Sequence, residues 1–433
     1  MANGIENDIH ALVKDGLLTD ANAEAIRAWY ERKNAANPNR LILIFGVLGV
    51  LLVGSGISLL VAHNWDEMST QLKTFFAFLP LLVGQVWVGY TLLKNRESEM
   101  HREMSSGWLA LAIGVCISLI AQIYHIQGNF PLFLLTWLLL GLPLVYLLKS
   151  SVASLLFIAG ATWYGVEAGY EYNENQKNTW TYWLLIAAVL PHYYTLFRSR
   201  HSGWFTVIHH YALPVSLLIC LGILGERGGG KWMWMAYMNL LGIFYLSGQY
   251  LTDKGVTGIS NGYRIIGWVG SLLLLFIGSF KDFWTIYKFG IGMASNQLNA
   301  GTLPFFAGLG LALAGLALML LLFNKKVIGL MDPVIPAFLI YSLLFWVGFK
   351  APDIVTVLMN LYLLAIGVWL LIRGQQQERL AILNLGLGII AVLAICRFFD
   401  TDLSFIVRGV MFILVGAGFV YFNYQLIQKK KSV

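Results

Sequence analysis

The chain contains about fourteen stretches of roughly 17 to 23 mostly apolar residues between Leu41 and Leu426, and each is long enough to cross a hydrocarbon core about 30 Å thick. Of the 433 residues, 58% are hydrophobic and 12% are charged, whereas about 25% are charged in soluble domains. A soluble core cannot absorb this much apolar surface. The sequence therefore predicts an all-α, polytopic integral membrane bundle. The predicted spans cover residues 41–62, 72–93, 106–124, 130–148, 151–168, 180–197, 204–224, 232–252, 263–280, 303–323, 330–349, 353–373, 380–396 and 403–426.

The polar ends of the chain give the predicted domain limits. Residues 1–40 form a cytosolic helical hairpin and linker, 41–426 the transmembrane bundle, and 427–433 a basic cytosolic tail. Within the hairpin, Gly16 offers a helix end and Thr19 a cap for a second helix. Two helices this short bury too little apolar surface to stand alone. We therefore expect residues 1–36 to dock on the bundle or to bind a cytosolic protein partner.

The distribution of basic residues predicts the orientation of the bundle. When the connections between the predicted spans are assigned alternately to the two sides, about 20 of the 29 Lys and Arg residues fall on one side. Because short basic loops resist translocation, that side is cytoplasmic and both termini lie in the cytoplasm. The formal net charge of +7 follows from this bias, and it does not predict a nucleic-acid partner. Residues 1–40 are polar, so we expect no cleavable signal peptide.

Enzyme and cofactor signatures are missing from the sequence. There is no Walker loop, HExxH, GxSxG or CxxC motif. Cys116, Cys220 and Cys396 lie in or beside predicted spans without metal-ligand spacing. We therefore predict no catalytic residue, no cofactor and no metal site. An enzymatic function stays open as the less favoured alternative.

Four histidines gather near the predicted cytoplasmic ends of two spans, at His192, His201, His209 and His210. Histidine can bind metals or respond to pH. Adjacent residues on a helix point about 100° apart, and no acidic residue or cysteine accompanies the pair His209–His210. The pattern therefore indicates histidines in the interfacial region rather than a metal site.

Several short motifs resemble a known family. They are Gly16-Leu17-Leu18-Thr19, Ala25-Ile26-Arg27-Ala28-Trp29-Tyr30, Ala62-His63-Asn64-Trp65-Asp66 and Gln122-Ile123-Tyr124-His125-Ile126-Gln127-Gly128. Together they resemble the bacterial predicted membrane proteins of the family called domain of unknown function 2157, over roughly residues 10 to 150. The resemblance implies a multi-pass topology and a bacterial inner-membrane location. It implies no reaction.

Ionisable side chains inside predicted spans are costly and therefore mark candidate sites. A set with similar depth on the outward half of the bundle forms our predicted substrate-binding residues: Gln122, His125, Glu167, Arg397, Asp400, Asp402 and Arg408. Two interpretations stay open. Arg408 can pair with Asp400 or Asp402 as a structural clamp, or the set can line an outward cavity for a polar or anionic head group.

Two further segments carry open alternatives. The aromatic external connection from Lys281 to Thr302 can lie in the interface as an anchor, which we favour, or cover an outer cavity as a lid. Pro333 and Pro336 are expected to break or kink the start of the span 330–349, where Asp332 can cap the new helix end.

Three classes of function are compatible with these features. A secondary transporter or translocator of a polar or lipid-linked small molecule fits the number of spans and the buried polar groups. A scaffold or sensor would act through the N-terminal hairpin. An intramembrane enzyme would use the outward histidine and carboxylates on a lipid-linked substrate. The transporter is the preferred interpretation. Membrane lipids are the expected partners of the bundle surface.

Overall fold

The computed structural model describes most of the apolar region and part of the N-terminal segment. The described residues are 15–26, 65–170, 180–199, 203–225, 230–289, 302–329, 332–348 and 350–398, with isolated positions between 9 and 13, at 52, and between 406 and 420. The chain divides into two compact units, Met1–Phe76 and Ala77–Val433. Each unit is treated by itself below.

In the first unit, the local signals of the predicted hairpin are present. Gly16 has a φ of +70°, in the left-handed region that glycine tolerates at a helix end. The side chain of Thr19 accepts a hydrogen bond from the backbone N–H of Asn22 at 3.4 Å, at the start of a helix that continues to Ile26. The complete hairpin and the predicted span 41–62 lie outside the described residues, so both stay predictions.

The described part of the chain beyond residue 65 is helical and contains no strand. Its helices are α4 (Thr70–Lys94), α5 (Glu99–Ile123), α6 (Phe130–Leu147), α7 (Ser151–Gly169), α8 (Thr181–Ser199), α9 (Trp204–Leu221), α10 (Lys231–Asp253), α11 (Gly262–Gly278), α12 (Lys281–Phe289), α13 (Leu303–Asn324), α14 (Ala337–Gly348), α15 (Pro352–Gln376) and α16 (Leu380–Phe398). Two 3₁₀ turns accompany them, η1 (Gly222–Gly225) and η2 (Gly258–Ser260).

Eight of the described helices are long and apolar enough to cross a membrane. They are α4, α5, α6, α7, α9 with η1, α13, α15 and the part of α16 up to Arg397. Helices α11 and α14 are apolar but shorter. The multi-pass, all-helical prediction is therefore confirmed for the described residues, whereas the count of about fourteen spans stays a prediction.

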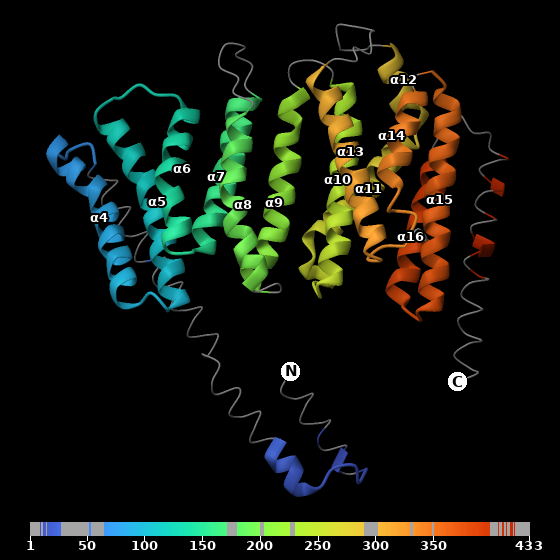
Figure 1. The fold of residues 1–433 in the computed structure, drawn as a ribbon, viewed down its shortest axis with the longest axis horizontal. Helices are drawn as coiled ribbons and strands as arrows, with labels where there is room; N and C mark the ends of the chain where they lie inside the picture. The colour runs from blue at the N-terminus through green and yellow to red at the C-terminus, as the bar shows by residue number, and fades with distance from the viewer. Residues whose placement is uncertain are drawn as a thin grey trace. The chain divides into compact units, whose positions relative to one another are not determined.

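Apart from the short α12, which stays at one end, the helices from α5 to α16 run in alternating directions, so their connections gather at two opposite ends of the second unit (Figure 1). The α6–α7, α10–α11, α13–α14 and α15–α16 connections share one end, which we call the basic end because Lys149, Lys254, Lys325, Lys326 and Arg379 lie in or beside them. The α5–α6 and α14–α15 connections lie at the opposite end.

Two large apolar cores hold the second unit together. One joins α6, α7, α8 and α9 around Ala161, Tyr182 and Val189, which are fully buried. The other surrounds α10, where Phe244 and Leu246 pack with residues of α11, α13, α14 and α15. Many outward-facing large apolar side chains stay exposed, as expected for helices that face lipid.

Capping side chains decide where several helices begin. Ser98, Asn129, Ser150 and Asn261 each accept a hydrogen bond from a backbone N–H three residues later. The predicted span 330–349 begins later than expected, because Pro333 and Pro336 lie in a turn and α14 starts only at Ala337. A proline has no N–H to donate and clashes with a preceding helical turn, which explains the shorter helix.

Candidate functional site

An open pocket lies at the basic end of the second unit, between α10, the α13–α14 connection and α15. Its volume is about 620 Å³, which is within the usual range for a small-molecule site. Charged, amide and apolar side chains all contribute to its wall. The lining residues are Gln249, Val327, Ile328, Gly329, Asp332, Ile335, Trp369, Ile372, Arg373, Gln376 and Gln377. We call it the Asp332 pocket.

Asp332 is the buried acid of this pocket, with 9% of its surface exposed. Its Oδ2 accepts a hydrogen bond from the hydroxyl of Tyr245 at 2.6 Å. Its Oδ1 accepts one from the backbone N–H of Val334 at 3.0 Å. Asp332 does not cap α14 as predicted, because α14 starts only at Ala337; its carboxylate instead fixes the turn that precedes this helix. Both oxygens have a donor.

Arg373 supplies the positive charge of the pocket. Its Nη1 lies 4.0 Å from Oδ2 of Asp332, and its side chain is 39% exposed. Its guanidinium carbon lies 4.8 Å from the ring centroid of Trp369, one helical turn earlier on the same face of α15. Stacking on the indole holds the guanidinium beside the pocket, while the long contact with Asp332 is too far for a hydrogen bond.

A second buried polar group lies on α5, α7, α8 and α9, also toward the basic end. Its members are Glu103, Ser154, His192, His209 and His210, and we call it the Glu–His cluster. All five are at most 9% exposed. Helices pack around His192, His209 and His210, and their location at the depth of the membrane interface stays a prediction. His201 lies outside the described residues.

The carboxylate of Glu103 caps the start of α7. It accepts hydrogen bonds from the hydroxyl of Ser150 at 2.6 Å, from the N–H of Ser151 at 2.9 Å and from the N–H of Val152 at 2.7 Å. The first N–H groups of a helix have no partner within it, and a negative charge there is favourable. Glu103 therefore joins α5 to α7 and is fully satisfied in this role.

The histidines differ in how well they are paired. His209 Nδ1 lies 2.7 Å from the carbonyl oxygen of Phe205, and its Nε2 lies 2.9 Å from the hydroxyl of Ser154. A carbonyl only accepts, so a neutral His209 carries its proton on Nδ1 and accepts at Nε2. His210 Nδ1 lies 3.1 Å from the carbonyl of Ser260. Among the described residues, Nε2 of His192 and Nε2 of His210 have no hydrogen-bond partner.

The described residues contain no group of three or more His, Cys, Asp or Glu that could hold a metal ion. The rings of His192 and His209 are 6.2 Å apart, and Tyr193 lies 6.0 Å from His209 and 5.9 Å from His210. The aromatic neighbours fill the space around the histidines. The cluster is a packed polar core and does not line either of the two pockets described here.

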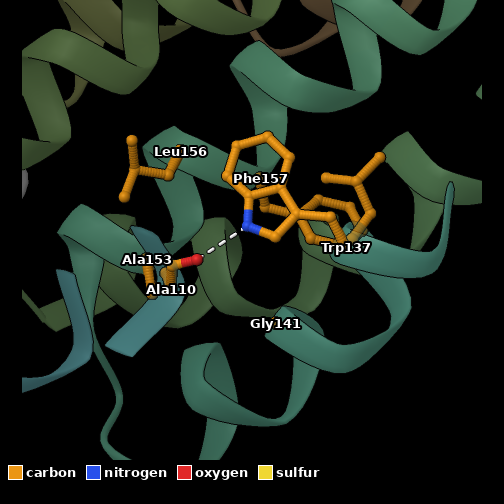
Figure 2. Close-up of a pocket in the computed structure, with 7 residues that line it drawn as sticks. Ala110, Trp137, Gly141, Ala153, Leu156 and Phe157 are labelled. Atoms are coloured by element: carbon orange, nitrogen blue, oxygen red, sulfur yellow. Dashed lines mark hydrogen bonds between the residues drawn. The ribbon is translucent and has the colours of Figure 1, made fainter. Parts of the chain in front are cut away.

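A small apolar pocket between α5, α6 and α7 is too small to bind a ligand (Figure 2). Its volume is about 10 Å³, roughly the space of one water molecule. The indole N–H of Trp137 donates across it to the carbonyl of Ala110 at 2.7 Å. Its other walls are apolar, so a water there would have few partners.

The described members of the predicted outward set lie at the end opposite the Asp332 pocket. Gln122 and His125 are exposed at the end of α5. Glu167 is half-buried on the neighbouring helix α7, where it accepts a hydrogen bond from Trp163 at 3.1 Å. Arg397 is buried at the end of α16, with its guanidinium 4.4 Å from the ring centroid of Phe280.

The structure thus places the outward residues on two separate parts of the second unit. Helices α5 and α7 pack together, whereas α16 packs against α15. Asp400, Asp402 and Arg408 lie outside the described residues. The outward set as a substrate site stays a prediction.

The connection after Lys281 begins with the short helix α12. Trp284 is fully buried and donates from its indole to the carbonyl of Gly278 at 2.8 Å. Lys281 forms an ion pair of 2.9 Å with Asp353. These contacts hold residues 281–285 against α11 and α15, and the choice between the interfacial anchor and the lid stays open. Residues 290–301 lie outside the described part.

The residues of the Asp332 pocket were missed because each had a simpler explanation in the sequence. Asp332 was assigned to helix capping and Arg373 to the cytoplasmic charge bias. A usable signal is present in the run Gly374-Gln375-Gln376-Gln377, which is unusually rich in amides for the end of a span. The contact between Tyr245 and Asp332 joins residues 87 positions apart, and no local pattern predicts it.

Comparison with known proteins finds similarity only over the N-terminal third of the chain. No curated protein and no solved structure matches the chain. The Asp332 pocket lies outside the region that has a family match, whereas Glu103 and Ser150 lie inside it. Residues 10–154 match the model of the predicted membrane protein family DUF2157, which confirms the family resemblance of the sequence over that segment.

Proposed function

We propose that the chain is a secondary transporter that carries a small polar molecule across the bacterial inner membrane and binds it in the Asp332 pocket. The observation that carries the proposal is the pocket itself, about 620 Å³ in volume and lined by a carboxylate, a guanidinium and amides at one end of a multi-pass bundle. Polar groups in such bundles mark substrate paths.

The proposed orientation follows from the charges beside the pocket. Lys325 and Lys326 end α13, and Arg379 follows α15. Short basic connections lie in the cytoplasm, so the pocket opens inward in this conformation. We retain both termini in the cytoplasm, about fourteen spans and a cytosolic partner for residues 1–36 as parts of the same proposal. The predicted outward set, Gln122, His125, Glu167, Arg397, Asp400, Asp402 and Arg408, is retained as proposed substrate contacts on the outer side; of these, Gln122, His125 and Glu167 belong to α5, the connection after it and α7, which are not the helices that line the Asp332 pocket.

The two alternatives have less support. A scaffold acting through the N-terminal hairpin needs no polar pocket in the bundle. An enzyme acting on a lipid-linked substrate needs an acid or base that is free to exchange a proton with the substrate. Both oxygens of Asp332 already accept hydrogen bonds from Tyr245 and Val334, so the carboxylate is better placed to hold the pocket than to react.

Transport requires that the pocket become reachable from both sides of the membrane, and this can be tested before the substrate is known. Gln249 lies in the pocket wall and is partly exposed. In a background where the native cysteines are replaced by serine, Gln249→Cys should react with a membrane-impermeant maleimide added to either side of sealed vesicles. Reaction from the outer side should be slower, because the structure opens at the basic end.

Two exposed positions give the controls for this labelling. Arg96→Cys lies in the connection between α4 and α5, and Gln127→Cys lies in the connection between α5 and α6. Each should react only from its own side. If Gln249→Cys reacts from the cytoplasmic side alone while both controls behave as expected, the transport proposal fails.

A further inference from the structure

The two charged side chains that line the Asp332 pocket, Asp332 and Arg373, differ in how available they are to a ligand. Asp332 is nearly buried and both of its oxygens accept hydrogen bonds, from Tyr245 and from Val334. A cationic ligand would have to displace one of these donors or share an oxygen with it. The carboxylate therefore offers little to a cation, even though it carries a full negative charge in the pocket wall.

Arg373 is in the opposite situation. Its side chain is 39% exposed, and its closest carboxylate atom, Oδ2 of Asp332, lies at 4.0 Å. Among the described residues it donates no hydrogen bond shorter than that contact. A guanidinium has five N–H donors in a planar fork that matches a carboxylate or a phosphate. Stacking on Trp369 at 4.8 Å holds the fork in place before any ligand arrives.

Charged residues also flank the pocket. The exposed Glu378 and Arg379 directly follow Gln377 of the wall, so their charges balance each other. Lys325 and Lys326 directly precede Val327 of the pocket wall, and both are exposed. In the described part of the chain, Asp332 is the only acid that lines the pocket, and it is already paired with donors. An anion entering from the basic end therefore meets a favourable potential.

The rest of the wall suits a small organic anion. Gln249, Gln376 and Gln377 offer amide donors and acceptors, and Ile372 and Trp369 offer apolar surface. We propose that the Asp332 pocket binds an anionic ligand whose carboxylate or phosphate group is held by Arg373, which deepens the proposed transport function and rests on it. A free organic anion and the head group of an anionic lipid share this chemistry.

The local potential can be measured without knowing the ligand. Gln376→Cys places a thiol in the pocket wall, and Thr257→Cys places one in an exposed connection at the same end that does not line the pocket. Each thiol is reacted with the anionic reagent sulfonatoethyl methanethiosulfonate and with its trimethylammonium analogue. We expect the ratio of anionic to cationic rate to be about tenfold higher at Gln376→Cys than at Thr257→Cys.

Replacement of Arg373 tests the source of that potential. In the Gln376→Cys background, Arg373→Gln should reduce the rate ratio to that of the Thr257→Cys control. Arg373→Lys keeps the charge and should preserve most of the ratio. Equal ratios at the two thiols, or a ratio that favours the cationic reagent, would overturn the proposal.

Protection experiments then separate the two sources of the anion. Reaction of Gln376→Cys with neutral N-ethylmaleimide is measured with inorganic phosphate or succinate added, and in nanodiscs of phosphatidylglycerol or of phosphatidylcholine. Slowing by phosphate or succinate would support a free anion, and slowing confined to phosphatidylglycerol would support a lipid head group. No slowing in any condition would also overturn the proposal.

The anion proposal and the transport proposal fail in different ways. One-sided labelling of Gln249→Cys with a high anion ratio at Gln376→Cys would leave an anion site in a protein that does not transport. Two-sided labelling with equal reagent ratios would leave a transporter whose substrate is not an anion.

Discussion

The Glu–His cluster and the Asp332 pocket are both buried polar groups near the basic end of the bundle, but they are built in opposite ways. In the Glu–His cluster a satisfied carboxylate, Glu103, lies beside histidines with ring nitrogens that lack partners, and no described pocket is lined by them. In the pocket the buried acid Asp332 is satisfied, and the open space lies beside the half-exposed Arg373.

This difference separates polar groups that support the fold from those available to a ligand. Removing a partner from a buried polar group costs about 1 to 3 kcal/mol, because the remaining atom can no longer reach water. A half-exposed charge beside an open pocket still reaches water, so the loss of a partner costs it little. Its N–H donors also stay available to a ligand. We therefore expect substitutions in the Glu–His cluster to affect stability and substitutions at Arg373 to affect binding.

The largest effect is expected at Glu103. Glu103→Ala removes the acceptor for Ser150, Ser151 and Val152 and should lower the free energy of unfolding by about 3 kcal/mol. The change in the free energy of unfolding is measured by titration with SDS in mixed micelles. Glu97→Ala removes an exposed carboxylate just before α5, the helix that carries Glu103, and should change the free energy of unfolding by less than about 0.5 kcal/mol. Equal losses for both variants would contradict the capping role.

An intermediate effect is expected at Asp332. Asp332→Ala removes the acceptor for Tyr245 and the contact that fixes the turn at Val334. Water from the open pocket can replace part of what is lost, so we expect a loss of about 1.5 kcal/mol in the free energy of unfolding.

A double-mutant cycle checks the Asp332 prediction. Tyr245→Phe should cost less when Asp332 is already Ala, because the two side chains share one hydrogen bond. Strict additivity in the SDS titration would show that the contact contributes nothing to stability.

The helices of these two regions were largely predictable from the sequence, because apolar stretches and capping residues mark them. Helix α13 differs from its predicted span 303–323 by one residue at its end. Helix α5 begins earlier than predicted, at Glu99, since Ser98 caps it and the first turns are polar. Helix α14 was shortened by the prolines before it. In each case, residues close to the helix end explain where the helix begins or ends.

The buried polar groups were not predictable in the same way, because they depend on which helices become neighbours. Ser154 and His209 are 55 positions apart, and Tyr245 and Asp332 are 87 apart. A search for ionisable residues near the outward ends of spans selects Arg397 and Glu167, but overlooks Glu103 and Arg373, which lie toward the opposite ends of their helices. Packing between helices, not depth along one helix, determines whether such a residue is buried.

A smaller effect distinguishes two members of the Glu–His cluster. His209→Phe leaves the hydroxyl of Ser154 without its partner and should lower the free energy of unfolding by about 1 kcal/mol. His192→Phe removes a buried nitrogen that has no partner among the described residues, so it should be neutral or slightly stabilising. SDS titration of both variants gives the comparison. A larger loss for His192→Phe would show that this histidine has a partner in the working protein.

The smallest effect on stability is expected at Arg373, and it bears most directly on the comparison. Arg373→Gln removes a half-exposed charge whose carboxylate contact is 4.0 Å long, so the free energy of unfolding should change by less than about 0.5 kcal/mol. A loss above about 2 kcal/mol in the SDS titration would make Arg373 a structural partner of Asp332. An unchanged free energy of unfolding would mean that Arg373 does not stabilise the fold. That result is expected for a charged side chain whose role is to bind a ligand.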